Sequence, residues 1–81
     1  MVTITSLNKV FQKVDLQVGR RVSMTEISKL TGVSLVTLSR IKHNRVGYIR
    51  IDTFNRIIAV YPTVTPGDFY EVVEDADVDL S

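Results

Sequence analysis

The chain has 81 residues, of which 44% are hydrophobic and 23% are charged. This length suits one small globular domain and is too short for two separate cores. There is no cysteine, which excludes disulfides, thiolate metal sites and cysteine nucleophiles and is compatible with a reducing cytosol. No apolar run approaches the roughly 20 residues of a membrane span, and the first residues, "MVTITSLNK", do not resemble a signal peptide.

The net charge of +1 hides a strong asymmetry. Residues 1–70 contain all ten Lys and Arg side chains and carry a net charge of +6, whereas residues 71–81 carry −5. A basic body with an acidic end suits a protein that binds a polyanion, with the acidic end either pointing away from the ligand or partly competing with it. The alternative from charge alone is a solvated surface followed by a disordered end.

The first elements along the chain are a possible strand and a helix. "MVTIT" alternates between polar and apolar residues, although nothing in the sequence is an obvious partner strand. A helix is expected over about residues 6–15, and Gly19 breaks it. Four apolar side chains lie on one face of this helix: Leu7, Val10, Phe11 and Val14.

Two short helices separated by a turn are expected next. "SMTE" has the pattern of a capping box, in which Ser23 and Glu26 open a helix, and Gly32 ends it in a left-handed conformation. Ile27 and Leu30 are expected to point inward. Ser34 then caps a helix over about residues 35–43, which Asn44 can end in the same left-handed way.

Two further helices complete the expected fold. Asp52 is expected to cap a fourth helix over about residues 53–61, which Pro62 stops. Thr65 and Pro66 suit the start of a short fifth helix, and the residues beyond Val73 are expected to form a loose acidic tail. The inner face of the fourth helix is expected to comprise Phe54, Ile57, Ile58 and Tyr61.

The helix over residues 35–43 has an unusual outer face. At about 100° per residue, Leu38 and Ile41 point to the core. The opposite face therefore holds mainly compact side chains with one cation and one imidazole: Val36, Ser39, Arg40 and His43. A helix that faced only solvent would more often show Glu and Lys there, whereas a compact face can enter the major groove of DNA.

The stretch "MTEISKLTGVSLVTLSRIKHNR" resembles the helix-turn-helix of Cro and lambda-repressor-like (XRE-type) regulators, and the similarity continues into "YIRIDTFNRIIAVYPTVTPGDFYEV". The resemblance implies an all-α, compact five-helix DNA-binding domain over residues 1–73, with its motif at about 24–43 and an acidic, flexible tail at 74–81. It also implies a dimeric transcriptional repressor that binds a palindromic operator, in the cytoplasm of a prokaryotic or phage-infected cell.

The family's pattern assigns roles to individual positions of this chain. The residues expected to read bases are Leu35, Val36, Ser39 and Arg40. The residues expected to bind DNA phosphates are Met24, Thr25, Ser34, Lys42, His43, Asn44, Arg45 and Arg50. Arg20 and Arg21 could reach the flanking backbone. Phosphate contacts of this kind set affinity and salt dependence, whereas base contacts set sequence preference.

The sequence departs from its relatives at two of these positions. Family members often have Gln where this chain has Met24 and Leu35. The apolar pair puts adenine readout by Gln in doubt and leaves contact with thymine methyl groups as its replacement. The open alternative is that Leu35 packs on Met24 and reads nothing.

Double-stranded DNA and a second copy of the chain are the expected partners. The dimer surface expected from family analogy comprises Val64, Phe69, Tyr70, Val72 and Val73. No enzyme activity, cofactor, metal or small-molecule substrate is expected, because there is one His, no Cys and no glycine-rich phosphate loop. The alternative function is a non-enzymatic protein-interaction module, such as an antitoxin, antirepressor or adaptor, which the apolar tip at Leu35 and Val36 favours.

Overall fold

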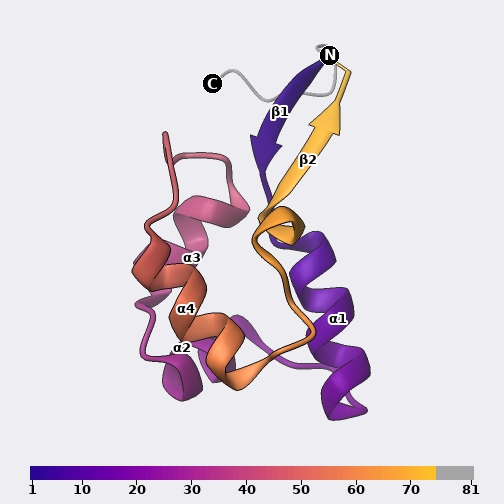
Figure 1. The fold of residues 1–81 in the computed structure, drawn as a ribbon, viewed down its shortest axis with the longest axis vertical. Coiled ribbons are helices and arrows are strands. Elements are labelled where there is room, and N and C mark those ends of the chain that lie inside the picture. The colour runs from indigo at the N-terminus through magenta and orange to yellow at the C-terminus, as the bar shows by residue number, and fades with distance from the viewer. Residues whose placement is uncertain (75–81) are drawn as a thin grey trace.

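A computed structural model describes residues 1–74 of the chain. It contains the helices α1 (Asn8–Val18), α2 (Met24–Thr31), α3 (Leu35–Lys42) and α4 (Ile51–Val60), and the 3₁₀ helix η1 (Pro66–Phe69). The strands β1 (Val2–Thr5) and β2 (Tyr70–Val73) pair at one end of the helical body (Figure 1). None of the helices in this part of the chain is long and apolar enough to cross a membrane. The predicted acidic tail lies, apart from Glu74, outside the described residues.

The prediction of an all-α fold is wrong, because the two ends of residues 1–74 form an antiparallel two-stranded sheet. Val2 lies opposite Val73, and Thr5 lies opposite Tyr70. The alternation in "MVTIT" indicated a strand correctly, but its partner is more than 60 residues away, in a stretch that was expected to follow a helix. We call this pair of strands the ribbon.

The prediction of a fifth α-helix is also wrong, because Pro66–Phe69 form a single 3₁₀ turn. The start of this turn was predicted correctly. The backbone N–H of Thr65 donates to Asp68 Oδ2 at 2.7 Å, and the hydroxyl of Thr65 donates to the same oxygen at 3.0 Å. Extended backbone resumes at Tyr70, and its pairing with β1 takes the place of further helical turns.

The boundaries of two helices differ from those expected. The helix expected over about residues 6–15 is α1, which begins at Asn8 and continues to Val18, where Gly19 ends it with a φ of 82°. The fourth helix, α4, begins at Ile51 with Arg50 as its N-cap. Asp52, expected to be the cap, lies in the first turn and accepts a hydrogen bond from Arg56 Nε at 2.9 Å.

One hydrophobic core lies between the helices, with contributions from every helix and from the loops. Most of the side chains expected to point inward do so, including Val10, Val14, Ile57 and Tyr61. Leu30 is an exception with 57% of its surface exposed, because α2 is short and buries only Ile27 and Thr31. Phe54 of α4 meets Phe69 of η1 edge to face, with ring centroids 5.1 Å apart.

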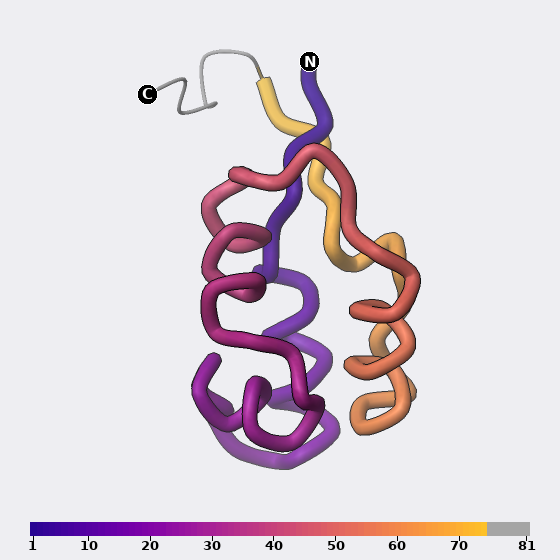
Figure 2. The backbone as a smooth tube through the Cα atoms, turned by 90° about the vertical axis from the view of Figure 1, so that its left-hand side faces the viewer, coloured from indigo at the N-terminus to yellow at the C-terminus, as the bar shows by residue number. Residues whose placement is uncertain are grey.

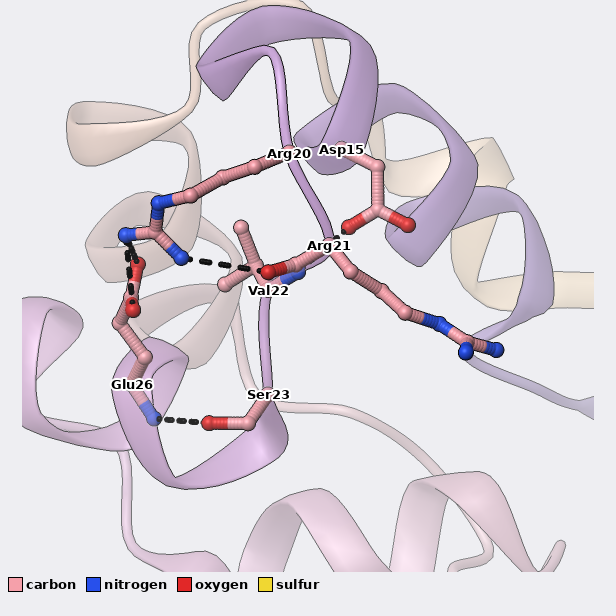
Figure 3. Close-up of polar contacts among 6 residues, drawn as sticks. All are labelled: Asp15, Arg20, Arg21, Val22, Ser23 and Glu26. Atoms are coloured by element: carbon pink, nitrogen blue, oxygen red, sulfur yellow. Dashed lines mark hydrogen bonds and ion pairs between the residues drawn. The ribbon is translucent and has the colours of Figure 1, made fainter.

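The connection between α1 and α2 is held by a group of polar contacts (Figure 3). Asp15 Oδ1 accepts the N–H of Val22 at 2.9 Å. Arg20 donates to both carboxylate oxygens of Glu26, and this hydrogen bond raises the pKa of Arg20. Ser23 Oγ accepts the N–H of Glu26 at 3.1 Å. Ser23 therefore caps α2 as expected, but the Glu26 carboxylate turns to Arg20 and does not close the capping box.

A buried carboxylate fixes η1 against α1. Asp68 Oδ2 lies 2.8 Å from Lys13 Nζ, and the Asp68 side chain is only 11% exposed. Burial by itself would raise the pKa of Asp68, but the bonds from Lys13 and Thr65 outweigh burial and hold the pKa below its ordinary value. The ionised carboxylate therefore stabilises the folded state.

Replacement of Asp68 by Asn should destabilise the fold in a pH-dependent way. At pH 7 we expect D68N to lower the free energy of unfolding by about 1–3 kcal/mol, because a hydrogen bond to a charged group is lost. A depressed pKa contributes stability that is complete above the unfolded value of 3.8 and disappears as the pH falls through the lower folded value. Urea unfolding at several pH values should show the difference between D68N and the parent protein shrinking below pH 3.8. A difference that stayed constant with pH would contradict this account.

Candidate nucleic-acid interface

The turn between α2 and α3 brings the two helices close together. Gly32 has a φ of 79°, and its N–H donates to the carbonyl of Ser28 at 2.9 Å. Thr31 is buried in this turn, where its hydroxyl donates to the carbonyl of Ile27 at 2.6 Å and accepts the N–H of Val33 at 3.2 Å. The backbone groups of the turn are thus satisfied while Val33 enters the core.

The side chain of Ser34 orients the start of α3. Its Oγ accepts the N–H of Thr37 at 3.1 Å and lies 2.9 Å from the Thr37 hydroxyl. The cap predicted from the sequence is confirmed, and Thr37 is a member of this site that the sequence did not single out. Its place three residues after a capping Ser was the signal that could have identified it.

The inner and outer faces of α3 are divided as the helical periodicity predicted. Leu38 and Ile41 are almost completely buried, at 1% and 0% exposure. Val36 is 60% exposed and Leu35 is 41% exposed, so the helix presents an apolar tip at its first turn. Arg40 is exposed on the next turn, and Ser39 is half-buried. The four residues expected to read bases therefore lie on one helix. Three of them are exposed, and Ser39 is partly covered.

The end of α3 forms a closed turn at Asn44. This residue has a φ of 55°, as the sequence led us to expect. Its N–H donates to the carbonyl of Ile41 at 3.2 Å, and the N–H of Arg45 donates to the carbonyl of Arg40 at 2.8 Å. This pair of bonds is the Schellman motif. Asn44 Oδ1 accepts the N–H of Thr5, and the Nδ2 group is the part of this side chain that can donate to a phosphate.

Cations surround the exposed end of α3. Residues 27–51 contain five Lys and Arg side chains and no Asp or Glu. Lys42, His43, Arg45 and Arg50 are all exposed. These side chains lie at the end of α3 opposite to the apolar tip, and the next carboxylate along the chain, that of Asp52, pairs with Arg56 Nε at 2.9 Å.

A shallow hollow of about 280 Å³ lies between α3, the loop after it and the start of α4. Its polar lining comes from all three parts: Thr37 and Arg40 of α3, Tyr48 and Arg50 of the loop, and Asp52 and Thr53 of α4. Tyr48 is 77% exposed. The hollow thus brings two of the predicted DNA-contacting arginines to one surface with a hydroxyl group from Tyr48.

The remaining predicted contacts lie at the start of α2. Met24 is half-buried and packs against the core, whereas Thr25 is exposed. The guanidinium of Arg20 donates to Glu26 and is therefore not free to bind a phosphate. Arg21 instead extends away from that cluster of contacts (Figure 3).

Two short helices crossing at a tight turn, with the second presenting an exposed outer face that carries Arg40 and has further exposed cations at its end, define a helix-turn-helix DNA-binding domain. The family model of the Cro/C1-type HTH DNA-binding domain matches residues 18–75, well over half of the chain. The chain therefore belongs to the Cro/C1-type helix-turn-helix family, in agreement with the resemblance seen in the sequence. Comparisons with curated proteins and with solved structures gave no significant match.

Proposed function

We propose that this protein is a small transcriptional repressor that binds a palindromic operator as a dimer and places α3 in the major groove. The observation that carries the proposal is the surface of α3, where an exposed apolar tip is followed by exposed Arg40, Lys42 and His43. The carboxylate of Asp52, which lines the hollow beside Arg40, is paired with Arg56. A repressor of this kind acts by occupying the site that the transcription machinery needs.

Leu35, Val36, Ser39 and Arg40 are proposed to read bases. The guanidinium of Arg40 can hold O6 and N7 of a guanine, and the apolar tip suits the methyl groups of thymine. Because Leu35 is exposed, it is available for such a contact. The eight residues proposed for phosphate binding supply affinity without base preference: Met24, Thr25, Ser34, Lys42, His43, Asn44, Arg45 and Arg50.

The surface expected for dimer formation needs revision. Val64 and Phe69 are 1% and 0% exposed, because they are part of the chain's own core. The ribbon is a better candidate, since its sheet has only two strands in residues 1–74 and β2 has no neighbour on its outer edge. Val72 is 61% exposed on that strand. An uncovered edge with an exposed apolar side chain favours pairing with another strand, and we propose that β2 of a second copy supplies it.

The second candidate function is a protein-interaction module, which the exposed Leu35 and Val36 favour. The two functions differ in their dependence on salt. Binding to DNA releases counterions, so the affinity falls steeply as salt is added, whereas an apolar protein contact is much less sensitive. An absence of binding to every duplex in a random-sequence selection would contradict the repressor proposal and favour the second function.

The first prediction of this proposal concerns Arg40. In a titration with the operator selected from random duplexes, R40A should lose about 1–3 kcal/mol of binding free energy and tolerate changes at one base pair that the parent protein rejects. Arg56 provides a matched control, because it lies on α4 and pairs with Asp52. R56A should bind nearly as the parent protein does. Equal losses from both variants would indicate general charge and would contradict base reading by Arg40.

The apolar tip gives a second prediction, which uses uracil in place of thymine. Removal of each contacted methyl group should cost the parent protein about 0.8 kcal/mol of binding free energy. L35A should show a smaller difference between the thymine and uracil duplexes, because it has already lost part of the contact. If the parent protein binds both duplexes equally at every thymine position, Leu35 and Val36 do not read thymine.

The third prediction concerns the dimer. V72K should shift the protein towards a monomer in sedimentation experiments and weaken binding to the full operator more than to a half-site, because Lys opposes strand pairing at an edge. L16K is the control, since Leu16 is 83% exposed on α1, which lies outside the ribbon. A V72K protein that remained a dimer would contradict the proposed interface.

A further inference from the structure

The identity of residue 44 is not explained by the backbone of the turn that it occupies. A left-handed residue at the end of a helix is most often Gly, because Gly has no Cβ to clash. Asn tolerates this conformation but is the less favourable choice. The two backbone bonds that close the turn, from Asn44 to Ile41 and from Arg45 to Arg40, would form equally well with Gly at this position.

The side chain of Asn44 makes a contact that Gly could not make. Its Oδ1 accepts the backbone N–H of Thr5 at 3.0 Å and the hydroxyl of Thr5 at 3.3 Å, across 39 positions of sequence. Thr5 is the last residue of β1 and is only 5% exposed. A buried N–H that loses its acceptor is costly, so this bond is a strong reason for Asn at position 44.

The same contact joins two parts of the molecule with different roles. On one side, Asn44 follows directly from the end of α3, the helix proposed to read DNA. On the other side, Thr5 belongs to the ribbon, where it lies opposite Tyr70, and the next residue, Ser6, donates its N–H to the carbonyl of Phe69 at 2.8 Å. In Figure 2 the chain after α3 crosses in front of the two strands.

We propose that Asn44 is a positioning residue that sets the orientation of α3 relative to the ribbon, and thereby the separation of the two α3 helices in the dimer. The inference rests on the proposed function, namely DNA binding by a dimer that pairs through the ribbon. The two half-sites of such an operator lie about one helical turn apart. A small rotation at the Asn44–Thr5 contact would move each α3 away from its half-site.

The test compares N44G with the parent protein on four duplexes: the selected operator, the same operator with its half-sites moved apart or together by one base pair, and a single half-site. Gly keeps the left-handed turn and removes the side-chain contacts with Thr5, together with the phosphate contact proposed for Asn44. We expect N44G to bind the half-site and the shifted operators more weakly than the parent protein does, and to lose about tenfold more affinity on the operator with the natural spacing. Its preference for the natural spacing over the shifted ones should fall towards one.

N44D is the matched control, because Asp also tolerates the left-handed conformation and keeps an oxygen to accept the N–H of Thr5. Its charge should weaken binding to all four duplexes. For each variant, the affinity for the natural spacing is divided by the affinity for a shifted spacing. A loss of affinity that is common to all duplexes then cancels. We expect N44D to restore this ratio to near the value of the parent protein. Urea unfolding of each variant establishes that it is folded at the assay temperature.

Three results would overturn the proposal. If N44G loses affinity on the half-site with a shallower dependence on salt, while the natural and shifted operators weaken alike, Asn44 acts through its phosphate contact alone and does not set spacing. If N44G keeps the full preference for natural spacing, the contact does not position α3. If the parent protein binds the operator without any spacing preference, Asn44 does not set the separation of the two α3 helices, but the proposal of DNA binding is not contradicted. Failure of the parent protein to bind any duplex would instead remove the proposed function itself.

Discussion

The close crossing of α2 and α3 depends on a left-handed residue at position 32, and the whole surface offered to DNA follows from it. Gly32 lets the chain turn within a few residues, while the buried hydroxyl of Thr31 satisfies backbone groups that this turn would otherwise leave without partners. Leu38 and Ile41 can then enter the core. Because these two side chains are buried, the helical period points Val36 and Arg40 outward.

A hydrophobic core of this size needs additional stabilising contacts at its edges. The ribbon closes one end of it, and Asp68 ties η1 to α1 through Lys13. Arg20 and Glu26 connect the approach to α2 with its first turn. These polar contacts hold the helices together without occupying the outer face of α3. The outer face of α3 consequently takes no part in these stabilising contacts, except at the two ends of the helix.

The sequence departs from the family's pattern at Met24 and Leu35, where the resemblance leads us to expect Gln. An apolar contact with thymine methyl groups discriminates through shape and burial, whereas a Gln discriminates through paired hydrogen bonds to adenine. The surrounding cations attract any DNA sequence equally. In the proposed function, affinity and selectivity therefore reside in different residues of the same surface.

The sequence by itself determined the local features: the caps at Ser23, Ser34 and Thr65, the left-handed positions at Gly32 and Asn44, and the buried and exposed faces of α3. Each depends on a few neighbouring residues, so spacing and residue type are sufficient to predict it. The tertiary structure alone decided that β1 pairs with β2, that Leu30 stays exposed and that Asn44 reaches Thr5. The two contacts join residues that are far apart in the chain and come together only after the helices have packed. The exposure of Leu30 depends on the same packing.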